Sequence, residues 1–237
     1  MILVIETSTT SIGVAVGTGR EAASTVRHRG RPRHGELLAP TIEFCLAQAG
    51  VGMKDIDAIG VDAGPGLFTG LRVGVAAAKA LGFALSRPVC VLNSLDILAW
   101  PLRWWPGTVV AALDGRKGQC FWAAYRRQGA LWAPISGIGS GSPEDMAYEV
   151  GRLGSGVAFV GDAASRYGER IGVDGSRPVI GDTHPNPEAA LELAALAVER
   201  GEGIDAMSVS ALYLRAPDAK VSWKVERPHA PSGTAAP

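Results

Sequence analysis

Cysteine is scarce in this chain of 237 residues, which contains only Cys45, Cys90 and Cys120 and no C-x-x-C pair. An odd number of widely spaced cysteines argues against a disulfide framework and a cysteine zinc site. Charge of one sign is not in excess, since Lys and Arg number 23 and Asp and Glu number 23. A chain-wide basic field for nucleic acid is therefore absent. No uncharged apolar run reaches about 18 residues and no secretory leader begins the chain, so we expect no membrane contact and a cytoplasmic location.

Motifs of common hydrolases and metal sites are also missing. The four histidines, His28, His34, His184 and His229, form no H-x-x-x-H or H-E-x-x-H pair, which argues against a helical metal site. No G-x-S-x-G elbow of a serine hydrolase occurs. His28 and His34 stand in a basic stretch, and we expect both to be solvated.

Three aspartates leave a choice open. Asp62, Asp114 and Asp162 each end a predicted strand beside a glycine. A carboxylate in this position can hold Mg²⁺, act as a base or start a turn. Turn formation is the simpler interpretation of all three.

What the chain does have is apolar residues, at 47% of the total, so it can bury a core and is not globally disordered. A strand over 2–5, a hydroxyl-rich turn over 7–11 and a strand over 12–16 predict a hairpin. Further elements are predicted as strands over 22–28, 57–62 and 89–92 and helices over 36–49, 71–85 and 94–99. An aromatic and proline cluster over 100–106 then breaks the pattern.

The second half restarts with another hairpin, over 108–113 and 120–125, whose turn is also polar. Further elements are predicted as a helix over 143–153, a strand over 157–160 and an alanine-rich helix over 187–200. The repetition predicts two similar α/β lobes with a cleft between them. We place the amino-terminal lobe at 1–102, the carboxy-terminal lobe at 103–226 and a disordered tail rich in Pro, Ala, Ser and Gly at 227–237.

The most informative motif is a glycine loop that follows a strand and opens a helix. It runs from Asp62 to Arg72 with the spacing G-x-G-x-x-x-G, and Thr69 is the expected helix cap. Glycines at a helix amino terminus can cradle an anion. The spacing misses the dinucleotide fingerprint by one residue and lacks the Lys-Ser/Thr ending of a P-loop. From the residues alone, a tight turn with close packing remains the simpler alternative.

Two helices predict unusually extensive burial. Helix 71–85 is apolar on nearly every side, which predicts burial all round, and Gly74, Ala78 and Gly82 form a ridge of small residues that would let another helix approach closely. Helix 36–49 carries two apolar stripes. They consist of Leu38, Ile42, Cys45 and Ala49, with Leu37 and Phe44 beside them. These patterns fit an interface with another subunit or a central position in a monomer, and burial alone does not separate the two.

Several short motifs together resemble one known family. They are Ile5-Glu6-Thr7-Ser8-Thr9, His34, Gly64 to Arg72, Ala78-Lys79-Ala80-Leu81, Asn93-Ser94-Leu95, Asp114 to Lys117 and Tyr213-Leu214-Arg215. In order and spacing the chain is similar to the TsaB family, bacterial subunits of the tRNA threonylcarbamoyladenosine machinery. The resemblance covers about 1–225 and is strongest in the first hundred residues.

The resemblance implies an α/β, actin-like ATPase fold (ASKHA, ribonuclease H-like) with two similar lobes. It implies a non-catalytic scaffold that pairs with the catalytic subunit TsaD and, with the ATPase TsaE, supports transfer of threonylcarbamoyl to tRNA. The acceptor is the adenosine beside the anticodon in tRNAs that read codons beginning with A. Free protein could form a homodimer, and tRNA would be met through the complex.

The resemblance implies no catalytic residue, no metal and no cofactor for this chain, since ATP and Mg²⁺ are used by the partner subunits. The nearest candidates for holding a cofactor are Thr7, Ser8, Thr9, Gly64 and Gly66. The pairing surface would lie on the two apolar helices. Its expected residues are Leu38, Ile42, Cys45, Leu71, Gly74, Val75, Ala78 and Gly82.

The chain departs from the family pattern at three positions. Glu6 stands where Asp is usual, Leu67 where Ser is common and Ala211 where Pro is usual. The longer Glu6 side chain would crowd a phosphate–Mg²⁺ site. The alternative function is a small ATP-dependent phosphotransferase of the same fold, using Thr9, Asp114 and the glycine loop. A peptidase is a third and weaker hypothesis, because no nucleophile elbow or metal pair is present.

Overall fold

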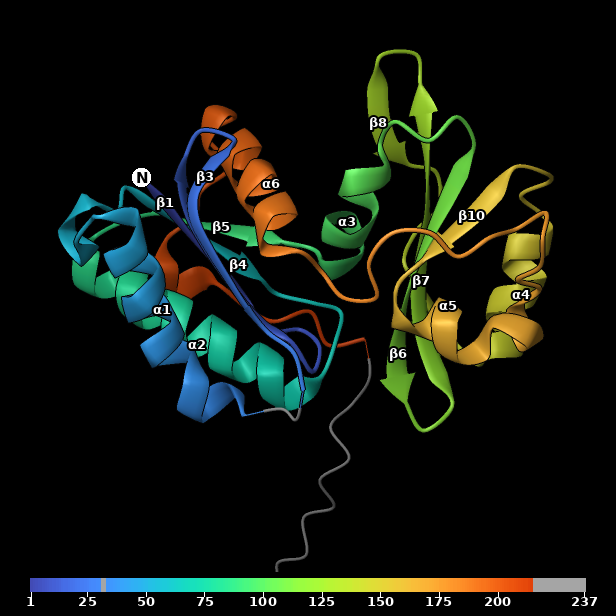
Figure 1. Ribbon diagram of the computed structural model, residues 1–237, viewed down its shortest axis with the longest axis horizontal. Coiled ribbons are helices and arrows are strands. Elements are labelled where there is room, and N and C mark those ends of the chain that lie inside the picture. The colour runs from blue at the N-terminus through green and yellow to red at the C-terminus, as the bar shows by residue number, and fades with distance from the viewer. Residues whose placement is uncertain (31–32, 215–237) are drawn as a thin grey trace, which may run out of the picture.

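Two lobes lie side by side in the computed structural model, which describes residues 1–30 and 33–214 (Figure 1). The predicted tail over 227–237, the end of the predicted carboxy-terminal lobe and Arg215 of the last motif lie outside the described residues. Each lobe is built on a mixed sheet. The α/β class with two lobes is therefore as predicted.

The amino-terminal lobe has a five-stranded sheet in the order β3-β2-β1-β4-β5. Its central strands are β1 (Ile2–Glu6) and β4 (Ala58–Asp62), which pair in parallel, and every residue of both is buried. Continuous apolar runs suit strands that are covered on both faces. The flanking strands are β2 (Ile12–Thr18) and β3 (Glu21–His28) on one side and β5 (Val89–Leu92) on the other.

Helices cover both faces of this sheet (Figure 1). Leu3 and Ile5 of β1 face the core under α1 (His34–Ala49) and α2 (Phe68–Leu85), whereas Ile2 and Val4 face α6 (Pro187–Glu199). The alternation follows from the two-residue period of a strand. The short helix α3 (Ser94–Ala99) follows β5, and the Asn93 side chain caps it by accepting from Leu95 N.

The carboxy-terminal lobe is smaller than predicted. Its sheet has the order β10-β6-β7-β8, with β9 also paired to β7. The predicted lobe extends too far, because α6 and the chain after it return to the first lobe. Residues of α6 pack on β1, and the Ile204 backbone pairs with Val89 of β5. The helical pattern of α6 showed an amphipathic helix but not which sheet would bury it.

The elements of this lobe follow the second hairpin. The hairpin strands are β6 (Thr108–Arg116) and β7 (Gln119–Gln128), and β10 (Val157–Val160) lies parallel to β6. The helix α4 (Pro143–Gly151) is capped by Ser142.

Several short elements were not predicted because each spans less than two turns of helix or a few edge residues. They are β8 (Leu131–Pro134), β9 (Gly139–Gly141), α5 (Asp162–Tyr167) and the 3-10 turns η1 (Met53–Asp55), η2 (Trp100–Leu102), η3 (Gly168–Ile171) and η4 (Ala206–Ser208).

One helix of the described chain, α2, is long and apolar enough to cross a membrane by length and composition. A single helix of this kind is weak grounds for a membrane span, because core helices have the same composition. In this lobe, α2 packs one face on the sheet, where Val75 and Ala78 join the main core. The prediction that it is buried all round is wrong, since Ala76, Ala80 and Phe83 are exposed.

Candidate functional site

The hairpin turn and the glycine loop meet at the carboxyl ends of β1 and β4. Leu67 N donates a hydrogen bond to Ser8 O at 2.6 Å. A Cβ atom at Gly66 would lie 2.2 Å from the same oxygen, and one at Gly70 would lie 2.0 Å from Thr7 O. These glycines are therefore required for close packing of the loop on the turn, and a side chain at either position would collide with backbone.

Two acidic side chains are buried beneath this contact. Glu6 ends β1, Asp62 ends β4, and both are fully buried. Glu6 Oε1 accepts from the amide and the hydroxyl of Ser8, each at 2.7 Å, and Asp62 Oδ1 accepts from Ser94 Oγ at 2.6 Å and Gly64 N at 2.9 Å. The second oxygens, Glu6 Oε2 and Asp62 Oδ2, have no hydrogen-bond partner among the described residues.

Burial raises the pKa values of both carboxyl groups. The pKa of Glu6 rises to about 8, because burial disfavours its charged form and the Asp62 carboxylate repels it. Burial also raises the pKa of Asp62 to about 6, against the opposing hydrogen bonds from Ser94 and Gly64. Burial thus favours the neutral form of both carboxyl groups, and of Glu6 most strongly. A neutral carboxyl is a poor ligand for Mg²⁺.

The five candidate cofactor residues lie close together, but several of their polar groups form hydrogen bonds within the turn and loop. Thr7 Oγ1 donates to Gly70 O at 2.9 Å, Ser8 is bound to Glu6, and Thr9 Oγ1 accepts from Ser11 N at 3.2 Å. Gly64 N is bound to Asp62, and Gly66 lies against the turn. Phosphate binding needs free donors at such a turn. The hydroxyls of Thr7 and Ser8 are thus already engaged by neighbouring groups, and the expectation that this chain holds no cofactor stays a prediction.

His34 is not solvated, contrary to the sequence-based expectation. It is the first residue of α1 and is 4% exposed. Its Nε2 lies 2.9 Å from Thr9 O and 3.3 Å from Ser11 O, so the ring secures the hairpin turn to the helix. His28, in contrast, is exposed at the end of β3. Likewise the helix cap predicted at Thr69 is wrong, because α2 begins at Phe68 without a side-chain cap.

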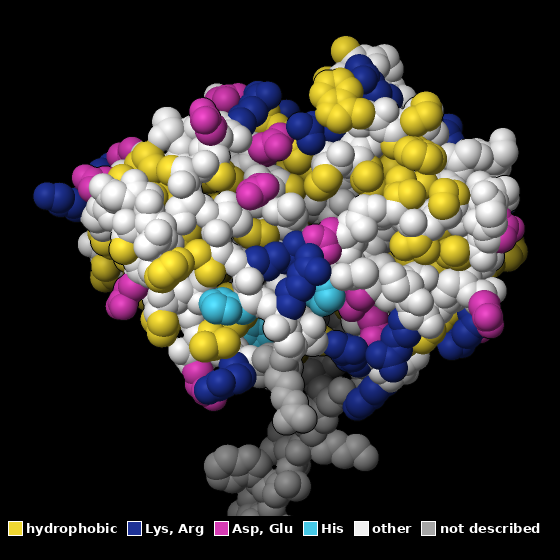
Figure 2. Space-filling model, in the orientation of Figure 1, with side chains coloured by type: hydrophobic (Ala, Val, Ile, Leu, Met, Phe, Trp, Pro, Cys, Tyr) yellow, Lys and Arg dark blue, Asp and Glu magenta, His cyan; other side chains and the backbone are white. Residues whose placement is uncertain are grey.

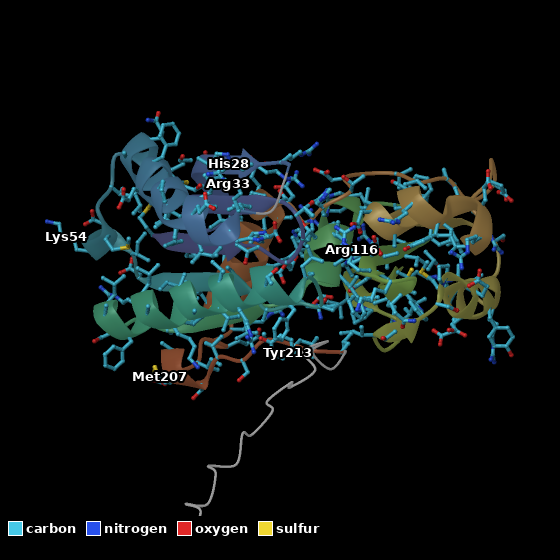
Figure 3. All side chains as sticks on the ribbon, turned by 90° about the horizontal axis from the view of Figure 1, so that it is seen from below. His28, Arg33, Lys54, Arg116, Met207 and Tyr213 are labelled. Carbon is cyan, nitrogen blue, oxygen red and sulfur yellow. The ribbon has the colours of Figure 1, made fainter. Side chains whose placement is uncertain are left out.

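A small cleft of about 210 Å³ separates the glycine loop from the β6–β7 turn. Arg116, in this turn, and Tyr213 line it from opposite sides (Figure 3). Asp114, at the same turn, is buried and is held by Arg116 and Arg166, each at 3.0 Å. Its amide donates to Asp162 Oδ1 at 2.8 Å. Both aspartates thus stabilise the turn, which is the simpler of the roles considered from the sequence.

The residues expected to contact a partner lie inside the lobe instead. All eight are buried, namely Leu38, Ile42, Cys45, Leu71, Gly74, Val75, Ala78 and Gly82. A Cβ atom at Gly74 would lie 2.3 Å from Thr7 Oγ1, and one at Gly82 would lie 2.8 Å from Ala206 Cβ. The ridge of small residues therefore brings α2 close to its own sheet and to η4, and not to another helix surface. Those eight assignments are corrected accordingly.

The outward sides of the same two helices carry exposed apolar side chains. On α1 the Phe44 side chain is 55% exposed, and on α2 the Phe83 side chain is 71% exposed. Ala76, Ala80 and Ala84 are exposed on α2 as well. The two helices run next to each other on one side of the sheet (Figure 1). We call the exposed residues Phe44, Ala76, Ala80, Phe83 and Ala84 the α1–α2 face. The sequence signal for it was the second apolar stripe, which includes Phe44.

Known proteins are similar to this chain in sequence. A family model described as TsaD, tRNA N6-adenosine threonylcarbamoyltransferase, matches residues 29–153. The tRNA threonylcarbamoyladenosine biosynthesis protein TsaB of Bacillus subtilis is 28% identical over 226 residues, which cover 94% of this chain and 97% of the relative. An uncharacterized protein of Mycobacterium leprae is 31% identical over 224 residues, and the match spans 56% of that longer protein.

Solved structures agree with the sequence matches. YeaZ from Pseudomonas aeruginosa superposes with a TM-score of 0.77 at 29% identity, covering 90% of this chain and 99% of that one. An uncharacterized protein with similarity to peptidase YeaZ from Pseudomonas aeruginosa has the same TM-score at 31% identity and the same coverage. Together with the strand orders, these likenesses confirm the actin-like ATPase fold predicted from the motifs.

Proposed function

The chain belongs to the TsaB family, and from that premise we propose that it is a non-catalytic subunit of the tRNA threonylcarbamoyladenosine machinery. It pairs with a TsaD-like catalytic subunit in the cytoplasm. With a TsaE-like ATPase, the pair transfers threonylcarbamoyl to the adenosine beside the anticodon of tRNAs that read codons beginning with A. The role of this chain is to hold the catalytic subunit in its active arrangement.

The observation that carries the pairing role is the α1–α2 face. Two phenyl rings, Phe44 and Phe83, stand exposed on helices whose other sides are anchored in the core. Exposed apolar patches mark interaction surfaces, and aromatic residues supply much of the energy at their centres. A surface of this kind can also pair with a second copy of the chain when the partner is absent.

The geometry of the turn supports a non-catalytic role. The hydroxyls of Thr7 and Ser8 are engaged within the turn and loop, and burial raises the pKa of Glu6 to about 8, which favours its neutral form. Nucleotide chemistry would then belong to the partner subunits. Tight ATP binding by the isolated chain in calorimetry would contradict this and favour the small phosphotransferase instead.

Pathway membership is tested by nucleoside mass spectrometry of bulk tRNA after depletion of the protein. We expect threonylcarbamoyladenosine to fall on depletion and to return with the wild-type chain. Unchanged levels under verified depletion would overturn the proposed function.

The pairing surface is tested by Phe83→Asp, measured as co-elution with the TsaD-like subunit from the same cell. A charge at the centre of an apolar contact should weaken pairing at least about tenfold. Tyr148→Asp is the matched control, since Tyr148 is also 71% exposed but lies on α4 of the other lobe. Equal pairing by both variants would show that the α1–α2 face is not the interface.

A further inference from the structure

A second surface feature lies where α6 faces β8 (Figure 2). Two adjoining cavities of about 510 and 450 Å³ run between the lobes here. Four residues line both of them, namely Trp100, Trp132, Leu196 and Arg200. We call the two cavities together the α6–β8 groove. It lies across the first lobe's sheet from α1 and α2, so a partner on the α1–α2 face would leave it open (Figure 1).

The wall of the smaller cavity is basic. It contains four guanidinium groups, from Arg20, Arg103, Arg127 and Arg200, against the single carboxylate of Glu192. Arg103 donates to that carboxylate at 3.0 Å. Arg127 donates one hydrogen bond, to Gly129 O at 3.4 Å. Arg20 and Arg200 also pair with the carboxylates of Glu199 and Glu202, at 3.3 and 3.8 Å, but all four side chains are more than half exposed and such surface pairs hold weakly. With these partners counted, the wall keeps a small excess of positive charge, which favours an anionic ligand.

Aromatic rings alternate with these cations. The Trp104 ring is 70% exposed, with the guanidinium of Arg127 5.2 Å and that of Arg103 5.6 Å from its centroid. Trp132 stacks on Tyr125 with centroids 6.1 Å apart and an interplanar angle of 8°. An exposed indole flanked by guanidinium groups offers flat surfaces beside fixed positive charge, which is the combination that holds a base and its phosphate.

We propose that the α6–β8 groove binds a single-stranded segment of nucleic acid, with bases stacked on the exposed indole and guanidinium planes and phosphates on Arg20, Arg127 and Arg200. A duplex keeps its bases stacked on one another and would leave the indoles unused. An acidic peptide would satisfy the cations but has no regular series of flat rings. The proposal relies on the proposed function only for the identity of the strand, which would then be an unpaired region of tRNA.

The test uses the full chain alone and fluorescence anisotropy of a labelled 12-nucleotide RNA of unstructured sequence. We expect saturable binding that weakens with salt, with a slope near −0.7 per phosphate contacted. A blunt RNA duplex of the same length and a poly-glutamate peptide should bind much more weakly. Binding of the peptide or of free AMP as tightly as the strand would overturn the assignment, as would no binding of the strand.

Two variants locate the site. Trp104→Ala removes the exposed indole and should weaken binding at least about fivefold, since one stacked base is lost. Arg127→Gln keeps the indole and should weaken binding while lowering the salt slope by about 0.7. The double variant Tyr148→Ala, Arg152→Gln removes a comparable pair, with Arg152 6.0 Å from the Tyr148 ring on the distant α4. Equal losses in this control and in Arg127→Gln would place the RNA elsewhere.

This test is independent of the proposed pathway. Pairing through the α1–α2 face is measured with Phe83→Asp, tRNA modification is measured by depletion, and strand binding is measured with residues of the other face. A wild-type chain that binds no strand, although its depletion lowers threonylcarbamoyladenosine, would overturn the groove assignment alone. Strand binding without any effect of depletion on the modified nucleoside would overturn the proposed function alone.

Discussion

Thr7 and Gly74 are in direct contact, with the Thr7 hydroxyl in the place where a side chain at residue 74 would begin. A Cβ atom on Gly74 would lie 2.3 Å from Thr7 Oγ1, well inside van der Waals contact. The same hydroxyl donates to Gly70 O, one turn earlier in α2. The hairpin turn and α2 are therefore fitted to each other through a glycine, and this contact sets how closely the helix lies on β1.

Gly74→Ala gives a test in which two physical effects have opposite signs. Helix propensity alone predicts that alanine stabilises the fold by about 0.5–1 kcal/mol. The contact with Thr7 predicts a loss of about 1–3 kcal/mol, as for other overpacked cores. We expect the contact to dominate, so the free energy of unfolding in urea should fall. Gly35→Ala on α1 is the control, since its new Cβ meets nothing within 4 Å; equal stability changes in both variants would contradict the fit.

Glu6 predicts an unusual dependence of stability on pH. Its pKa is about 8 in the folded chain, raised by burial and then by Asp62 from an ordinary value of 4.5. Between these two values the folded state binds more protons than the unfolded state, so stability is full below about pH 4.5 and is lost as pH rises through about 8. Glu6→Gln cannot ionise and should flatten the fall, measured by urea unfolding from pH 5 to 8.5.

The control for this pH dependence is Glu43→Gln on the exposed side of α1. It should leave the slope of stability against pH as it is in the wild-type chain. Burial also raises the pKa of Asp62, to about 6. Part of the fall of stability with rising pH should therefore remain in Glu6→Gln. A slope in Glu6→Gln that equals the wild-type slope would show that Glu6 does not take up a proton in the fold.

The three cysteines should be inert in the native chain. Cys45, Cys90 and Cys120 are all unpaired and buried. Burial raises the pKa of each thiol, and for Cys120, where Asp114 and Asp162 add repulsion, it rises to about 12. Because the thiolate is the reactive form, iodoacetamide at pH 7.5 should label none of them until the chain unfolds. Rapid labelling of any one in the native protein would contradict its burial.

The amino-terminal sheet was predictable because its signals are local. Continuous apolar residues in β1 and β4 and a hydroxyl-rich turn gave the strands and the hairpin. The sheet that α6 covers was not predictable, because a helix rich in alanine and leucine can cover any apolar sheet. Only the structure shows that it returns across the lobe boundary to pack on Ile2 and Val4.

The prediction of the partner surface was wrong for a related physical reason. Periodicity identifies the apolar sides of a helix but does not say which side faces the sheet. The sequence predicts the stripe through Leu38 and Ile42 as the partner surface, yet the sheet buries this stripe and leaves Phe44 outside. His34 was misplaced because its hydrogen bonds reach carbonyl groups at Thr9 and Ser11, more than twenty residues away. Such contacts leave no mark in local composition.

Arg27 on β3 fastens the segment that enters α6, and its loss should loosen that segment. Its guanidinium pairs with Asp182 and donates to His184 O at 2.9 Å and Pro185 O at 3.3 Å, with the side chain 16% exposed. Arg27→Lys keeps the charge but not the planar fork. It should speed hydrogen exchange of residues 182–186 and cost about 1–3 kcal/mol in urea unfolding. The control is Arg29→Gln, which removes a 61% exposed partner of the same carboxylate and should change the free energy of unfolding by less than about 0.5 kcal/mol. If hydrogen exchange of residues 182–186 is equally fast in both variants, the carbonyl contacts of Arg27 do not hold the segment.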